Sequence, residues 1–395
     1  MSGREILVDR AIFDGRGPLM RAAVLTGGRL SDLYIDNAER PSLLGSIFLG
    51  RVERIATGLD AAFIDLGTGK AGLLGVADAR GPKGRVERIG TLLRTGQSVL
   101  VQVKADAVGA KGPTLTMDVT LPGRFLVHAP LGRGIAVSKR LAQGPAKADL
   151  VRRLEAVVLG EGWIARSGAA TADADVLAQE AEALVLAWRA VRMQADGPAP
   201  ALLRRGPDAA QRALIEHGAA SRIAVEGKDL SASLTTWCAE YAPDLAGRVE
   251  AYTATPGLFE MSDLDSEIDT LLGTRVPLSA GGTLVIERTE ALTVVDVNAG
   301  ERGNALDANL EAAREIARQL RLRNVGGIVV VDFVNMKSRG EAERLLTALS
   351  AAVADDPAQT QVYGLSKLGL VEMTRARRGT ALADLLAPDS RGGNL

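Results

Sequence analysis

The stretch from Thr283 to Met336 constrains the fold of this 395-residue chain more than any other. Two apolar runs, 283–286 and 292–295, flank a short polar turn, which is the pattern of a β-hairpin. Apolar residues then recur at helical spacing between 310 and 320, and a glycine-containing turn ends that helix. A further apolar run, 328–331, predicts a third strand. The segment is therefore expected to run strand, strand, helix, strand.

An aspartate ends each of the last two predicted strands. Asp296 closes the second strand and Asp332 closes the third. If these strands are neighbours in one sheet, the two carboxylates lie side by side at its edge, where catalytic residues are often found. With the amide of Asn298 they would form an oxygen-rich site suited to Mg²⁺. The alternative is that both aspartates only cap strands or start turns, and the spacing alone does not decide between the two interpretations.

Three motifs in this part of the chain, VVDVNAG, NLEAAREIARQLRLRNVGGIVVVDF and GLVEMTRAR, resemble the catalytic core of the ribonuclease E/G family. A weaker resemblance extends from the N-terminus to about residue 380. The resemblance implies that Asp296 and Asp332 hold a catalytic Mg²⁺ and that Asn298 helps to orient the scissile phosphate.

The resemblance also implies a multidomain α/β fold. A split RNase H-like subdomain would comprise residues 1–37 and 214–278, interrupted by an OB-fold barrel of the ribosomal-protein type (38–121) and a 5′-sensor domain (122–213). A DNase I-like α/β catalytic subdomain would follow at 279–390. The residue pattern agrees in part, because short apolar runs with glycine turns predict a β-meander at the N-terminus and a small barrel after it.

The predicted barrel contains candidates for contact with single-stranded RNA. Phe63 could stack on a base, and four cations could contact phosphates: Arg51, Lys70, Lys104 and Lys111. The alternation in AAFID favours a core position for Phe63, whereas the resemblance implies an exposed ring near the cleavage site. A second phenylalanine of the family's pocket corresponds to Leu73, so the barrel is expected to grip RNA more weakly.

The segment 162–168 places Arg166, Ser167 and a glycine after an apolar run. By itself this pattern is usually an ordinary turn, although an arginine and a hydroxyl can also bind a terminal phosphate. The resemblance implies a pocket here that senses a 5′-monophosphate, made by Gly123, Val127, Arg166 and Ser167, where serine replaces the family's threonine. A helix is expected over 171–194, followed by a proline-rich linker.

The supply of residues favours metal-dependent chemistry. The two histidines, His128 and His217, stand in unrelated contexts, so a paired-histidine mechanism is disfavoured. The C-terminal motif carries Arg375 with two further arginines, which usually form a solvated face but could neutralise phosphates beside the aspartates. Arg375 is therefore a candidate catalytic residue.

Composition adds few restrictions. A net charge of −1 neither supports nor excludes an RNA substrate, and Cys238 has no second cysteine with which to pair. The charged N-terminus and the short apolar runs predict a cytoplasmic protein without a membrane segment. The resemblance implies a paired-cysteine zinc motif and a small terminal domain, and this sequence contains neither. Zinc is therefore not expected, and the protein is expected to be a monomer or a weak homodimer.

These observations predict an endoribonuclease specific for single strands. It would use Mg²⁺ to hydrolyse RNA, leaving 5′-phosphate and 3′-hydroxyl ends, in messenger RNA decay or in the processing of ribosomal and other RNA. The alternative is a non-catalytic RNA-binding protein derived from such a nuclease. Cleavage of a short 5′-monophosphorylated strand in Mg²⁺ would separate the two.

Overall fold

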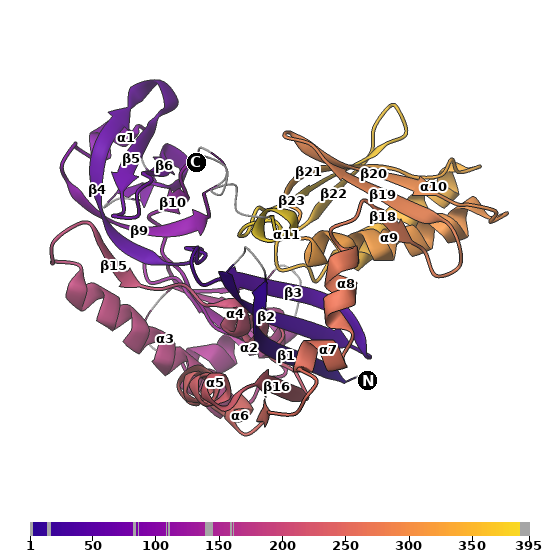
Figure 1. The fold of residues 1–395 in the computed structure, drawn as a ribbon. Helices are drawn as coiled ribbons and strands as arrows, with labels where there is room; N and C mark the ends of the chain where they lie inside the picture. The colour runs from indigo at the N-terminus through magenta and orange to yellow at the C-terminus, as the bar shows by residue number, and fades with distance from the viewer. Residues whose placement is uncertain are drawn as a thin grey trace, which may run out of the picture. The chain divides into compact units, whose positions relative to one another are not determined.

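The computed structural model describes residues 3–13, 17–81, 84–85, 87–107, 109, 111–138, 145–158, 160 and 162–387. The chain forms two compact units, which are shown in Figure 1. Unit 1 combines Met1–Glu39 with Thr253–Leu395, and unit 2 is Arg40–Tyr252. Each unit has its own buried hydrophobic clusters. None of the helices in the described ranges is both long enough and apolar enough to cross a membrane.

Unit 2 contains a closed five-stranded barrel. Its strands are β4 (Ile47–Ala56), β5 (Ala61–Asp65), β6 (Gly72–Gly75), β10 (Thr114–Thr116) and β9 (Ser98–Ala105). The barrel closes because β4 pairs with both β5 and β9. Ile64, Leu74 and Leu115 are fully buried inside it. The small barrel predicted from the glycine-punctuated runs is thus confirmed, and β15 (Ala201–Arg204) extends it by pairing with β4.

A second part of unit 2 packs helices against a small four-stranded sheet. The strands are β11 (Leu121–Pro122), β12 (Leu126–His128), β14 (Trp163–Ala165) and β13 (Ile135–Val137), in that order. The helices α2 (Pro145–Glu155) and α3 (Ala174–Gln194) bury leucines around Trp163. The helix expected over 171–194 is therefore confirmed as α3. Its Glu180 is buried and accepts the backbone N–H groups of residues 124–126.

The remainder of unit 2 is mainly helical. It comprises α4 (Ala209–Glu216), β16 (Arg222–Glu226), α5 (Lys228–Tyr241), α6 (Pro243–Ala246) and β17 (Val249–Tyr252). The strands β16 and β17 are parallel. A capping box of Asp208 and Gln211 starts α4, so this helix begins where its sequence satisfies the free N–H groups.

Unit 1 begins with the predicted β-meander. Its antiparallel strands are β1 (Arg4–Phe13), β2 (Gly17–Thr26) and β3 (Arg29–Asn37). The short helices α7 (Leu258–Met261) and α8 (Leu264–Thr270) belong to the same unit. Arg21 joins these segments, since its buried guanidinium binds Asp9 and Asp265 and lies 4.1 Å from the centre of the Phe259 ring.

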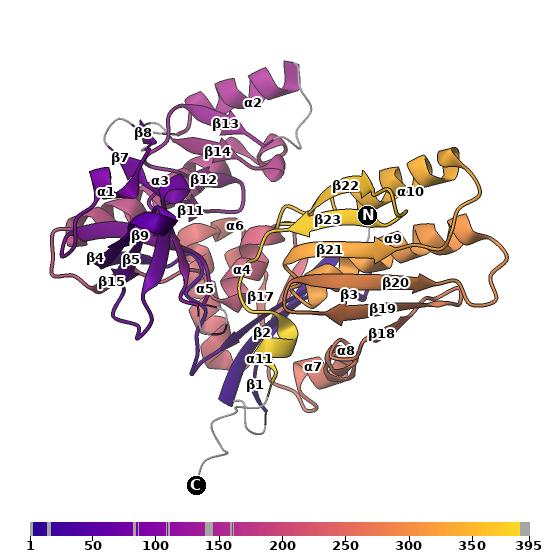
Figure 2. The same ribbon diagram turned by 90° about the horizontal axis from the view of Figure 1, so that it is seen from above.

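A six-stranded mixed sheet forms the rest of unit 1. Its strands, in order, are β18 (Arg275–Pro277), β19 (Thr283–Arg288), β20 (Leu292–Asn298), β21 (Gly327–Asp332), β23 (Val371–Arg375) and β22 (Gln361–Leu365). The helices α9 (Ala305–Leu322) and α10 (Arg339–Ala352) cover one face (Figures 1 and 2). The predicted succession of strand, strand, helix and strand is confirmed.

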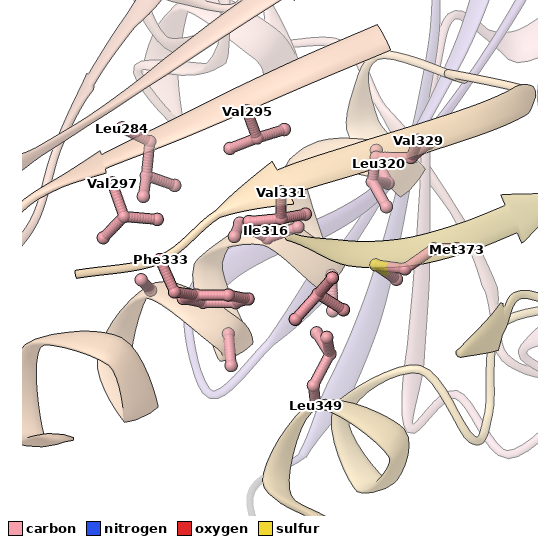
Figure 3. Packing of buried hydrophobic residues seen from close by; sticks show 14 of the residues in the cluster. Leu284, Val295, Val297, Ile316, Leu320, Val329, Val331, Phe333, Leu349 and Met373 are labelled. Atoms are coloured by element: carbon pink, nitrogen blue, oxygen red, sulfur yellow. The ribbon is translucent and has the colours of Figure 1, made fainter. Parts of the chain in front are cut away.

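The hydrophobic core between this sheet and its helices is continuous (Figure 3). Val295 and Val331 from the sheet pack with Ile316 from α9 and Leu349 from α10. Because side chains alternate along a strand, burial of Val295 and Val297 turns the residue between them, Asp296, to the opposite face. That face carries the exposed residues of the sheet, including Val294 and Ile328. The core thus sets the direction of the candidate catalytic side chains.

Candidate active site

The two predicted aspartates lie next to each other. Strands β20 and β21 are parallel, and Asp296 stands directly opposite Asp332 in their register. Adjacent strands lie about 4.8 Å apart, so the two side chains share one face at the same end of the sheet. The prediction that consecutive strands bring these carboxylates to one edge is confirmed.

The pair keeps its negative charge available for a ligand. Both aspartates are exposed, and neither forms a salt bridge with any residue that the structure describes. Asn298 Nδ2 donates a 2.6 Å hydrogen bond to Asp296 Oδ2, which holds that carboxylate in place. The described residues contain no cluster of three or more metal-binding side chains. Mg²⁺ commonly binds one or two carboxylates and keeps several waters, so the pair fits this ion.

A hydrogen-bond network fixes the loop that follows β20. Arg302 Nη1 lies 2.6 Å from Glu311 Oε2, and Ser279 Oγ donates to Glu311 Oε1 at 2.6 Å. The hydrogen bond from Ser279, aided by the Ala280 N–H and Arg302, lowers the pKa of Glu311 to about 2. Gly282 is required nearby, because a Cβ there would lie 2.4 Å from the carbonyl oxygen of Asn298. The network therefore supports the backbone that carries Asn298.

Arg375 does not lie beside the aspartates, and this prediction is wrong. It pairs with Gly327, the first residue of β21, whereas Asp332 is the last. Its guanidinium is buried and binds both carboxylate oxygens of Asp356, at 2.8 and 3.1 Å. A third hydrogen bond, 2.8 Å long, reaches the carbonyl oxygen of Val325. The side chain is used by the fold and has little capacity left for a phosphate.

The barrel presents Phe63 in a half-buried position. Its neighbours Ala62 and Ile64 are buried instead, so the core position that the alternation in AAFID favours for Phe63 is wrong. The centre of the Phe63 ring lies 4.1 Å from the guanidinium carbon of Arg54. Leu73 stands directly opposite Phe63 in the register of β5 and β6. The two positions implied by the resemblance therefore share one side of the barrel.

The four predicted phosphate-binding cations of the barrel differ in whether they already bind other groups of the protein. Lys104 forms a 2.7 Å salt bridge with Asp78, Lys70 donates to the carbonyl oxygen of Gly109, and Arg51 donates to that of Ala199. Lys111 is exposed and has no salt bridge within the described ranges. Lys111 is thus the most accessible of the four for a phosphate.

The predicted 5′-sensor residues are partly assembled. Arg166 Nη1 donates to the carbonyl oxygen of Gly123 at 2.9 Å, which joins two segments 43 residues apart. Ser167 follows it and is exposed, and Val127 is half-buried on β12. The sequence did not reveal Glu216, which binds Arg166 Nη2 at 2.5 Å. A carboxylate 50 residues away gives no local pattern, so only the structure could identify this partner.

A mixed sheet that ends in two adjacent carboxylates, neither paired with a cation among the described residues, defines a candidate metal-dependent hydrolase. The profile of the Ribonuclease E/G family matches residues 120–378. The chain is 35% identical to Ribonuclease G from Escherichia coli (strain K12) and to that from Salmonella typhimurium, over 388 residues that cover 93% of this chain and 79% of each relative. It is 36% identical to Ribonuclease E from Nostoc sp. over 92% of this chain and 55% of that protein. The chain belongs to the Ribonuclease E/G family.

Proposed function

We propose that this protein is a Mg²⁺-dependent endoribonuclease specific for single-stranded RNA. It hydrolyses phosphodiesters to leave 5′-phosphate and 3′-hydroxyl ends, in cytoplasmic RNA processing or decay. Membership of the ribonuclease family supports an endoribonuclease with RNA as its substrate. The observation that carries the metal-dependent chemistry is the register of β20 and β21, which sets Asp296 against Asp332.

In this proposal the two aspartates hold the cation and Asn298 orients the reacting groups. Asn298 already fixes Asp296 through its 2.6 Å hydrogen bond, so the carboxylate needs little rearrangement on binding. When bound, Mg²⁺ makes water nucleophilic at neutral pH and stabilises the charge that develops on the phosphate. Attack on phosphorus expels the 3′-oxygen, which accounts for the proposed ends.

The sensor residues extend the proposal to the 5′ end of the substrate. Arg166 and Ser167, with the backbone at Gly123 and Val127, would bind a terminal monophosphate. The proximity of Arg166 to Gly123 supports this assignment. Glu216 must give up its contact with Arg166, at least in part, when the phosphate binds, because both anions use the same guanidinium. Phe63 and Lys111 on the barrel would contact bases and phosphates of the same RNA strand.

The proposal is tested by neutralising each carboxylate. Asp296→Asn and Asp332→Asn should each lower the rate of cleavage at least about a thousandfold, which corresponds to about 4 kcal/mol of lost transition-state stabilisation. RNA affinity should stay close to that of the wild type, since the change affects chemistry and not docking. Both are measured on a 5′-monophosphorylated single strand, with Mg²⁺ for cleavage and with EDTA for binding.

Asp355→Asn is the matched control, because Asp355 is exposed in the same unit and lies 3.6 Å from Arg321, outside the proposed site. Its cleavage rate should be unchanged. Wild-type turnover by either active-site variant would show that the metal assignment is wrong. Tight RNA binding by the wild-type protein, without cleavage in Mg²⁺, would support the non-catalytic alternative.

A further inference from the structure

Whereas the carboxylate pair belongs to unit 1, unit 2 contains a pocket of its own. It lies among the end of β15, the loop around β11, and the helices α3, α4 and α5. Its wall includes aromatic, cationic and amide side chains, and those that matter for its chemistry are Arg124, Arg204, Arg205, Gln211, Trp237 and Tyr241. The proposed cleavage uses none of these six side chains, although the wall also includes Gly123 of the proposed sensor.

One wall of the pocket is aromatic. Trp237 and Tyr241 are four residues apart on α5 and therefore lie on the same face of the helix. Their ring centroids are 5.4 Å apart with an interplanar angle of 27°, so the rings are stacked. Both residues are only half-buried. The stacked pair is thus accessible to a further flat group.

The other walls are rich in positive charge. Arg204 Nη2 donates to the Tyr241 hydroxyl at 3.2 Å, and its guanidinium carbon lies 5.5 Å from the centre of that ring. Arg205 is exposed and forms no salt bridge with the described residues. Arg124 is buried, and its Nε–H has no hydrogen-bond partner in the described part of the chain. These groups favour an anionic ligand.

Glu180 is the one acidic side chain of the wall, and Glu240 lies beside the wall, where it is hydrogen-bonded to the Tyr241 side chain. Glu180 is buried and directed to the backbone N–H groups of Arg124, Phe125 and Leu126, which already satisfy it. Asp244 binds Arg124 but leaves Arg204 and Arg205 unpaired with any carboxylate in the described ranges. An inorganic anion would leave the aromatic wall unused, and an apolar ligand would leave the arginines unused.

We propose that this pocket binds one nucleotide of a single-stranded RNA substrate, as a docking subsite made only by residues of unit 2. The base stacks on the Trp237 and Tyr241 pair, and Arg204 and Arg205 contact the adjoining phosphate. Stacking of bases on aromatic side chains beside arginines is the general mode by which proteins hold single strands. The subsite reads no sequence by itself, because every base offers a flat face.

The test measures RNA affinity in EDTA by fluorescence anisotropy, with a 5′-hydroxyl single-stranded decanucleotide as the probe. These conditions exclude cleavage and involve no terminal phosphate, so the result does not depend on the metal site or on Arg166. Trp237→Leu should weaken binding roughly tenfold, since it retains bulk but removes the stacking surface. Trp237→Phe keeps an aromatic ring and should retain most of the affinity.

A second variant, Arg204→Gln, tests the role of positive charge. It should weaken RNA binding, and the magnitude of the slope of log affinity against log salt concentration should fall by about one. Arg152→Gln is its matched control: Arg152 is an exposed arginine of unit 2, on α2, outside the pocket wall. Thermal unfolding confirms that each variant is folded. Wild-type affinity in both Trp237→Leu and Arg204→Gln, or an equal loss in Arg152→Gln, would overturn the proposal.

Discussion

The two ends of β21 carry opposite kinds of polar site. At its last residue, Asp332 faces Asp296, and both carboxylates are exposed without a neutralising cation among the described residues. At its first residue, the neighbouring strand supplies Arg375, which is 6% exposed and satisfied by Asp356 and Val325. Both ends contain charges that a nuclease could use. Whether a charged side chain is still available for a ligand, and not its residue type, distinguishes a site for chemistry from a contact that stabilises the fold.

The buried carboxylate of Asp356 and the exposed carboxylates of Asp296 and Asp332 differ in their charged partners. Burial by itself would raise the pKa of Asp356, but the hydrogen bonds and charge of Arg375 outweigh that effect and hold the pKa below its ordinary value. Asp356 thus remains ionised as part of a closed pair. Among the residues that the structure describes, Asp296 and Asp332 have no such partner, so their charge is available for a cation.

The largest effect on stability is expected at the end of β21 where Arg375 binds Asp356. Arg375→Ala removes the guanidinium that forms two hydrogen bonds with the buried Asp356 carboxylate, and it should lower the free energy of unfolding by about 3–5 kcal/mol. Asp296→Asn, at the other end of the strand pair, should change the free energy of unfolding by less than about 0.5 kcal/mol. Urea unfolding monitored by circular dichroism measures both. Similar losses in the two variants would remove the distinction between the ends.

A smaller effect, on substrate preference, is expected at the salt bridge between Arg166 and Glu216. Arg166 is intermediate between the buried Arg375 and the exposed aspartates, because it has a carboxylate partner but is still partly exposed. Glu216→Gln removes the anion that competes with a terminal phosphate. The preference for 5′-monophosphate over 5′-hydroxyl RNA should rise by up to about tenfold, equivalent to about 1.4 kcal/mol. Initial cleavage rates on the two matched substrates give this ratio.

Glu182→Gln serves as the control for Glu216→Gln, since Glu182 is an exposed glutamate of α3. If Glu216→Gln accelerates both substrates equally, Glu216 acts on general RNA binding. If Arg166→Ala slows both substrates equally, Arg166 has a structural role and the sensor assignment fails.

The smallest effect, on the pH dependence of stability, is expected at Glu311, a hydrogen-bonded carboxylate in the network beside Asn298. Its pKa of about 2 lies below the ordinary value of 4.5, so the ionised form is favoured in the folded state. The stability that it contributes is present above pH 4.5 and is lost as the pH falls towards 2. Glu311→Gln should therefore be less stable than the wild type at pH 6, by under about 1 kcal/mol, with the difference disappearing in acid.

Urea unfolding between pH 6 and pH 2.5 tests this expectation, with Glu343→Gln as the control because Glu343 forms an exposed helical pair with Arg339. A difference between wild type and Glu311→Gln that stays constant across this range would show that Glu311 does not titrate as its contacts imply. The hydrogen bonds among Ser279, Arg302 and Glu311 thus limit movement of the loop beside Asn298 and leave the charges of Asp296 and Asp332 in place.

The sequence by itself determined the elements that bring the aspartates together. Short apolar runs in β20 and β21, separated by the amphipathic α9, favour a crossover between neighbouring strands, and this places Asp296 and Asp332 at the same end. The barrel and α3 were predictable for the same reason, because hydrophobic periodicity and glycine turns are local properties.

Only the tertiary structure decided which charged side chains were available. Arg375 binds a carboxylate 19 residues away, and Arg166 binds one 50 residues away, with no local pattern that announces either contact. The pocket around Trp237 and Arg204 likewise depends on segments from α3 to β15 and α5 meeting in space. A charge interacts with whatever the fold places within a few ångströms, so its role depends on long-range packing and not on its neighbours in sequence.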